Sequence, residues 1–75
     1  MWIEAEDGTL VCLDSVSYIT LEPDGDNWAV VACGPGPEFE YWLTLKAGLS
    51  KDKATEVMRV IRAIVLRGKI AWSFR

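Results

Sequence analysis

Residues 28–33 read Trp-Ala-Val-Val-Ala-Cys and are apolar at every position. A strand with apolar side chains on both faces is typical of the centre of a sheet that is covered on both sides. The segments before and after it alternate between apolar and polar residues, which is typical of strands with one face in a core. We therefore predict that residues 28–33 form the interior strand of an antiparallel sheet.

An alternating strand is expected on each side of this segment. Residues 16–22 place Ile19 and Leu21 on one face, and residues 23–27, Pro-Asp-Gly-Asp-Asn, have the composition of a turn. Residues 34–37, Gly-Pro-Gly-Pro, are expected to end the central strand, because proline has no amide hydrogen for a ladder. Residues 38–46 then alternate, with Trp42 as an apolar exception on the outward face. The inward side chains predicted there are Phe39, Tyr41, Leu43 and Leu45.

The N-terminal segment, residues 2–13, predicts a hairpin around Asp7-Gly8, a preferred pair for a two-residue type I′ turn. A turn of that length places Glu6 opposite Thr9 and Ile3 opposite Cys12. One face of the hairpin, expected in the core, then carries Ile3, Ala5, Leu10 and Cys12. The other face carries Trp2, Glu4, Val11 and Leu13.

A helix is predicted from Ser50, a plausible N-cap, to about Arg67, with Gly68 as the stop signal. Apolar residues recur at helical spacing and define one stripe. These residues are Ala54, Val57, Met58, Ile61, Ile64 and Val65. Polar residues occupy the opposite arc, namely Lys51, Thr55, Glu56, Arg59 and Arg62. Beyond Gly68, the alternation of Ile70, Trp72 and Phe74 predicts a short last strand that returns to a sheet edge or reaches another protomer.

The fold class expected for residues 1–75, as a single domain, is α+β. It consists of an antiparallel meander of about five strands, one C-terminal amphipathic helix packed on one face, and a short terminal strand. A chain of 75 residues has room for one core, and 51% apolar with 25% charged residues is a globular composition.

No apolar run approaches the roughly 20 residues of a membrane span, and the first residues lack the order of a signal peptide. We therefore expect a cytoplasmic protein without membrane partners. Cys12 and Cys33 are too few for a disulfide framework and are expected as buried free thiols. The chain has no histidine, and the cysteines lack the spacing of a zinc site, so no metal-binding residue is predicted.

Charge is divided sharply along the chain. Residues 1–45 contain nine acidic and no basic residues, whereas residues 46–75 contain all eight basic and two acidic residues. The halves carry −9 and +6, for a net charge of −3. Such a split can indicate an acidic partner or a nucleic acid. The simpler interpretation is that the halves attract each other, within one chain or between protomers.

Residues 2–14, Trp-Ile-Glu-Ala-Glu-Asp-Gly-Thr-Leu-Val-Cys-Leu-Asp, resemble the start of small uncharacterised bacterial or phage proteins. That group has an N-terminal acidic-Gly hairpin followed by Leu-Val-x-Leu-Asp, and a C-terminal helix. The resemblance implies the same architecture and a prokaryotic or phage origin, and it implies no activity. Cys12 stands where an asparagine is expected, and the segment after Gly68 is more apolar than in the group.

Catalysis is not expected. The chain has no histidine, no glycine-rich loop leading into a helix, no paired-cysteine motif and no serine in an elbow pattern. Its acidic residues fall mostly on expected turns and outward strand positions, where a carboxylate is ordinarily solvated. No catalytic or cofactor-binding residue is predicted, and no cofactor.

The leading hypothesis for function is a non-catalytic protein-interaction or structural module that self-associates, as a homodimer. Apolar residues occupy both faces of the strands, and one helix covers only one of them. Aromatic residues at such positions suit interface anchors. The interface residues predicted on this basis are Trp2, Trp28, Trp42, Trp72 and Phe74.

Two alternatives stay open. The first is a single-stranded nucleic-acid-binding module that uses the aromatic residues Trp72 and Phe74 with nearby bases. Those bases are Arg59, Arg62, Arg67, Lys69 and Arg75. The net charge of −3 argues against a nucleic-acid partner, because the acidic residues would repel phosphates. The second alternative is a small-ligand pocket between sheet and helix. The identity of any other protein partner stays unknown.

Overall fold

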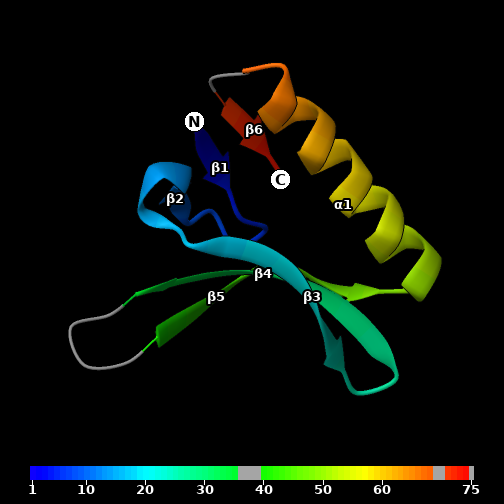
Figure 1. Cartoon of the computed structure of the whole chain (residues 1–75). Helices are drawn as coiled ribbons and strands as arrows, with labels where there is room; N and C mark the ends of the chain where they lie inside the picture. Colours follow the sequence, from blue (N-terminus) through cyan, green and yellow to red (C-terminus); the bar gives the residue numbers. More distant parts are fainter. Residues whose placement is uncertain (36–39, 69–70, 75) are drawn as a thin grey trace.

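The computed structural model describes residues 1–35, 40–68 and 71–74, and it divides the strands between two three-stranded sheets (Figure 1). The large sheet has the order β3-β4-β5, with β3 at Tyr18–Asp24, β4 at Asn27–Pro35 and β5 at Glu40–Leu49. The small sheet has the order β2-β1-β6, formed by Leu10–Cys12, Trp2–Glu4 and Ala71–Ser73. A short 3-10 turn, η1, covers Leu13–Ser15, and the helix α1 covers Lys51–Leu66.

The α+β class and the C-terminal helix are confirmed, and the strands arrange differently from one continuous meander. Only β3, β4 and β5 form a meander. The N-terminal hairpin pairs instead with β6, which runs parallel to β1 with Ile3 opposite Trp72. The terminal strand therefore returns to a sheet edge within its own chain, one of the two destinations predicted for it.

Strand β4 is the interior strand of the large sheet, as predicted from residues 28–33. Its residues 29–34 are buried, and Ile19 and Leu21 of β3 pack on the main core. The prediction that Gly34 and Pro35 end the strand is wrong, because they pair with Tyr41 and Glu40 of β5. Beyond Cys33, β5 is the one neighbour of β4 among the described strands, so the missing amide hydrogen of Pro35 removes no bond to β3.

The N-terminal hairpin has a three-residue loop, so the predicted register is wrong by one residue. Ile3 lies opposite Val11 instead of Cys12. The Ala5 carbonyl accepts a hydrogen bond from the Gly8 amide at 2.9 Å, and Gly8 has a φ of 93°. A turn followed by a left-handed glycine is the common three-residue hairpin loop. The shift places Val11 in the core and leaves Leu10 66% exposed.

Helix α1 begins and ends where the sequence predicts. The Ser50 hydroxyl accepts a hydrogen bond from the Lys53 amide at 3.2 Å, and Asp52 lies in the first turn. Gly68 follows the last turn with a φ of 70°, a backbone conformation that glycine adopts without steric cost. Ala54 and Ile61 are the buried members of the predicted stripe.

Ser50→Ala is expected to lower the free energy of unfolding by about 1 kcal/mol, because it leaves a helix amide without its side-chain acceptor. Ser50→Asp restores an acceptor and places a negative charge at the positive end of the helix dipole, so its stability should match the parent protein. Urea denaturation followed by circular dichroism at 222 nm measures both. Equal losses in the two variants would contradict a capping role for this side chain.

The main core lies where both sheets meet α1. It contains residues from β1, β2, β4, β5 and the helix, together with Ala5, which follows β1. Its buried members are Ile3, Ala5, Val11, Val30, Ala32, Leu45 and Ile61. Val11 was assigned to the face opposite the core by sequence, and it is buried. A smaller buried cluster of Ala29, Val31 and Cys33 lies on the other face of β4.

Glu6 joins the two sheets at an irregularity of β5. Two residues of β5, Leu45 and Lys46, correspond to Val30 of β4, which is a β-bulge. The Glu6 amide donates to the Leu45 carbonyl at 2.9 Å, and its carboxylate accepts from the Ala47 amide at 2.5 Å. The Lys46 ammonium lies 3.7 Å from the same carboxylate. Glu6 thus satisfies backbone groups of the irregular strand.

Several sequence predictions fall outside the described residues. They concern Gly36, Pro37, Glu38, Phe39, Lys69, Ile70 and Arg75. The side chain of Tyr41, predicted to point inward, also lies outside them.

Candidate functional site

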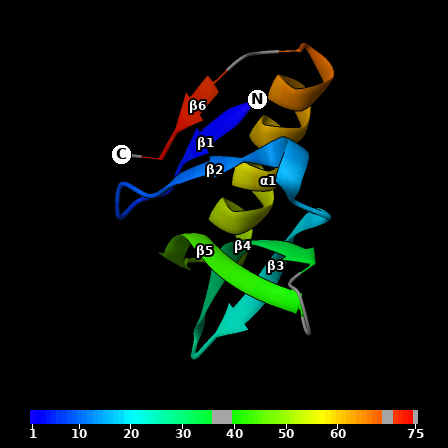
Figure 2. The same cartoon turned by 90° about the vertical axis from the view of Figure 1, so that its left-hand side faces the viewer.

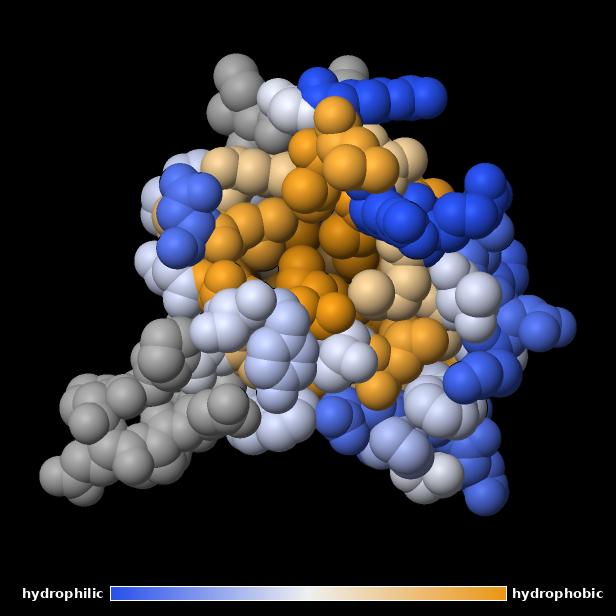
Figure 3. Space-filling view, in the orientation of Figure 1, coloured by the Kyte–Doolittle hydropathy of each residue, from blue (hydrophilic) through white to orange (hydrophobic). Residues whose placement is uncertain are grey.

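An apolar groove of about 700 Å³ lies between α1 and the start of the large sheet. In Figure 3 it is the hydrophobic depression at the centre of the molecule, bordered by hydrophilic side chains. We call it the helix groove. It is lined by Leu13, Val16, Tyr18, Ile19, Thr55, Met58, Arg59, Ile61, Arg62, Val65 and Leu66.

The helix groove exists because α1 is apolar over a wider arc than the core covers. Ala54 and Ile61 point into the core, and residues one step around the helix, such as Met58 and Val65, lie toward the groove. The opposite wall comes from η1 and from the beginning of β3. Val65 is 47% exposed and Leu66 is 77% exposed, so apolar surface remains in contact with solvent here.

Arg59 and Arg62 of the helix both line this groove, and they differ in whether a described carboxylate lies beside the guanidinium group. Arg59 forms an ion pair with Glu56 at 2.5 Å on the same helix. The hydrogen bond from Arg59 and its positive charge hold the pKa of Glu56 below its usual value, and Glu56 raises the pKa of Arg59. Arg62 is exposed and makes no hydrogen bond or ion pair within residues 1–35, 40–68 and 71–74. Within the described part of the chain, Arg62 is therefore a positive charge of the groove without an ion-pair partner.

A second candidate surface is the outer face of the small sheet. Ile3 and Val11 point into the core, so Trp2 and Leu10 point away from it. Figure 2 shows β1, β2 and β6 in front of α1, and the described part of the chain places no element over their outer face. Trp2 is 49% exposed. A shallow hollow there is lined by Trp2, Glu4, Leu10, Ala71, Trp72 and Ser73.

The structure brings together only some of the aromatic residues predicted at an interface. Trp2 and Trp72 line the same hollow, and the Trp72 and Phe74 rings meet edge to face with centroids 6.5 Å apart. Trp28 lies elsewhere, with the Lys51 ammonium 3.8 Å from its ring centroid. Trp42 is 54% exposed on β5 of the large sheet.

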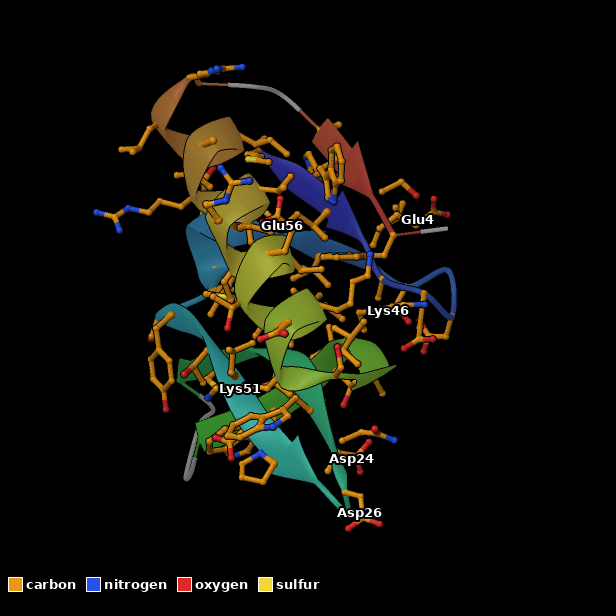
Figure 4. The ribbon with its side chains drawn as sticks, turned by 90° about the vertical axis from the view of Figure 1, so that its right-hand side faces the viewer. Glu4, Asp24, Asp26, Lys46, Lys51 and Glu56 are labelled. Carbon is orange, nitrogen blue, oxygen red and sulfur yellow. The ribbon has the colours of Figure 1, made fainter. Side chains whose placement is uncertain are left out.

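The basic and aromatic residues of the C-terminal half do not share one surface. Trp72 and Phe74 line a hollow with Glu56, Val57 and Val60 on one flank of α1. Arg59 and Arg62 line the helix groove, which lies on the other flank. Figure 4 shows Glu4 of β1 and Glu56 of α1 at the end of the molecule that carries β6. The aromatic pair is thus accompanied by carboxylates.

The charged halves of the chain meet at Glu6 and Lys46, which form the ion pair described above. Two acids of the N-terminal half lie apart from these bases. Asp24 and Asp26 occupy the tip of the β3–β4 hairpin, which projects away from the rest of the molecule (Figure 4). Cys12 and Cys33 are free thiols, as predicted; Cys33 is fully buried and Cys12 is half-buried.

The sequence analysis left a pocket between sheet and helix open as an alternative, and it predicted no lining residues for that pocket. The signal that was available is the width of the helix stripe, which includes Met58 and Val65 in addition to the buried positions. Leu66 falls outside that stripe, and Leu13 and Val16 flank a predicted break. Their convergence depends on how β3 lies against α1, which local patterns do not specify.

None of the described helices combines the length and hydrophobicity that a membrane crossing requires. Within the described residues, no three cysteine or acidic side chains come close enough together to hold a metal ion. No protein-family model matches this chain, and no curated protein or solved structure is significantly similar to it.

Proposed function

We propose that this protein is a non-catalytic cytoplasmic interaction module that self-associates as a symmetric homodimer through the outer face of its small sheet. The observation that carries the proposal is the exposure of Trp2 and Leu10 on a sheet face with no covering layer among the described elements. Tryptophan is among the residues that most often anchor protein interfaces. A twofold axis through this face would pair the same residues from both protomers.

The size of the domain supports this proposal. The small sheet has three strands of three residues each, so it buries little apolar surface by itself. A second molecule packed on its outer face would bury the exposed side chains of Trp2 and Leu10. Burying apolar area contributes about 25 cal/mol per Å². The free thiols Cys12 and Cys33 agree with a reducing compartment such as the cytoplasm.

Light scattering coupled to gel filtration, across a hundredfold range of protein concentration, is expected to give twice the 8.4 kDa chain mass at high concentration. Leu10→Lys combined with Trp2→Lys should raise the dimer dissociation constant by about 30-fold or more, since loss of an interface anchor costs about 2 kcal/mol. Both side chains are exposed, so the variant should keep its fold, which circular dichroism checks.

Trp42→Lys is the matched control, because Trp42 is as exposed as Trp2 and lies on the other sheet. It should leave the dissociation constant unchanged. If Trp42→Lys dissociated the dimer and the Trp2 and Leu10 variant did not, the protein would still self-associate. The assignment of the interface to the outer face of the small sheet would then be wrong. A parent protein that stays monomeric at every concentration would overturn the proposal itself.

A further inference from the structure

We propose that the helix groove binds a single-chain carboxylate amphiphile, with the alkyl chain along α1 and the carboxylate at Arg62. The groove and the outer face of the small sheet are different surfaces, so this proposal does not depend on self-association. Three features of the groove carry it: its size, its apolar lining and the positive charge of Arg62.

The size of the groove suits a small molecule. Its volume of about 700 Å³ lies within the roughly 300–1,000 Å³ of small-molecule sites. Its lining runs along the helix from Thr55 to Leu66, which spans roughly 16 Å at the rise of an α-helix. That length suits an extended alkyl chain of medium length.

The number of lining residues argues against a protein partner at this place. Eleven of the described residues line the groove, whereas a standard protein interface uses about 20–30 residues on each side. The lining is also mostly aliphatic, with Val16, Ile19 and Met58 among its members.

The polar groups at the groove define the charge of the ligand. Arg62 has no carboxylate partner among the described residues, while the charge of Arg59 is already balanced by Glu56. A guanidinium group binds a carboxylate through two parallel hydrogen bonds. Tyr18 and Thr55 contribute further polar edges to an otherwise apolar lining. An anion with an apolar tail therefore matches both the positive charge of Arg62 and the apolar lining of the groove.

The test titrates octanoate, decanoate and dodecanoate into the protein, each below its micelle concentration, by isothermal titration calorimetry. Affinity should rise about fourfold for each added methylene, the increment expected when the chain is buried in an apolar site. Methyl-labelled methionine reports the location by NMR. The Met58 signal should shift on binding because Met58 lines the groove, and the Met1 signal should not.

Arg62→Gln should weaken dodecanoate binding by about tenfold or more, because it removes a charged hydrogen-bond donor. It should leave binding of dodecanol, the neutral ligand of the same chain length, unchanged. Lys53→Gln is the matched control, since Lys53 is an exposed cation on the same helix outside the lining. That variant should bind dodecanoate like the parent protein.

Four results would overturn the proposal: no binding below the micelle concentration, an affinity independent of chain length, an equal shift of Met1 and Met58, or an unchanged affinity in Arg62→Gln. Vesicles of phosphatidylglycerol separate a free amphiphile from a lipid surface. Cosedimentation with vesicles in place of binding to free dodecanoate would also contradict the assignment.

Discussion

Leu45→Ala is expected to lower the free energy of unfolding by about 2–5 kcal/mol, the cost of a cavity left by a truncated core leucine. Leu45 has no exposed surface and belongs to the core cluster that includes Ile3 and Ile61. It lies at the bulge of β5, where the two sheets and the helix meet. Because whole domains are stable by only about 5–15 kcal/mol, this loss is a large fraction of the total and should shift the urea midpoint strongly. Urea denaturation followed by tryptophan fluorescence measures the loss.

Leu10→Ala is the matched control for that experiment and also tests the register of the N-terminal hairpin. Leu10 is 66% exposed in the monomer. Measured at a protein concentration well below the dimer dissociation constant, its truncation should change the unfolding free energy by less than about 0.5 kcal/mol. The two-residue turn predicted from sequence would place Leu10 in the core. A loss in Leu10→Ala comparable to that in Leu45→Ala would therefore contradict the three-residue loop at Gly8.

The sequence predicts those parts of the fold that depend on local chemistry. The Ser50 cap, the Gly68 stop and the apolar run of β4 each carry their own signal, and each is confirmed. The hairpin register depends on a small difference between two turns that both use Asp7-Gly8. One residue in the loop exchanges the faces of β2, so a small local error moves Leu10 and Val11 to opposite sides.

The division into two sheets and the helix groove depend on contacts between distant segments. Parallel pairing of β6 with β1 brings Trp72 opposite Ile3 across nearly the whole chain, and no local pattern specifies it. The predicted aromatic interface illustrates the consequence. Its five members have similar sequence signals, but Trp28 packs beneath Lys51 and Trp42 lies on the other sheet. These residues lie on different surfaces because of how the strands pair, which their local sequence does not specify.

Glu6→Ala is expected to lower the free energy of unfolding by about 1–3 kcal/mol, the range for hydrogen bonds that involve a charged group. The carboxylate of Glu6 accepts the Ala47 amide and lies 3.7 Å from the Lys46 ammonium, while its backbone binds Leu45. Its removal leaves the β5 bulge without its side-chain acceptor and loosens the junction between the sheets. Hydrogen exchange should show lost protection at the Ala47 amide, together with a lower urea midpoint.

Two further variants separate the hydrogen bond from the ion pair. Glu6→Gln keeps an acceptor oxygen for the Ala47 amide, and Lys46→Met removes only the cation. Both side chains of the pair are more than a third exposed, so solvent screening limits its value to less than about 1 kcal/mol. Both variants should therefore be more stable than Glu6→Ala and should keep the protection of the Ala47 amide. If Lys46→Met costs as much as Glu6→Ala, the junction depends on charge and the backbone hydrogen bond contributes little, which would contradict the role assigned to the bulge.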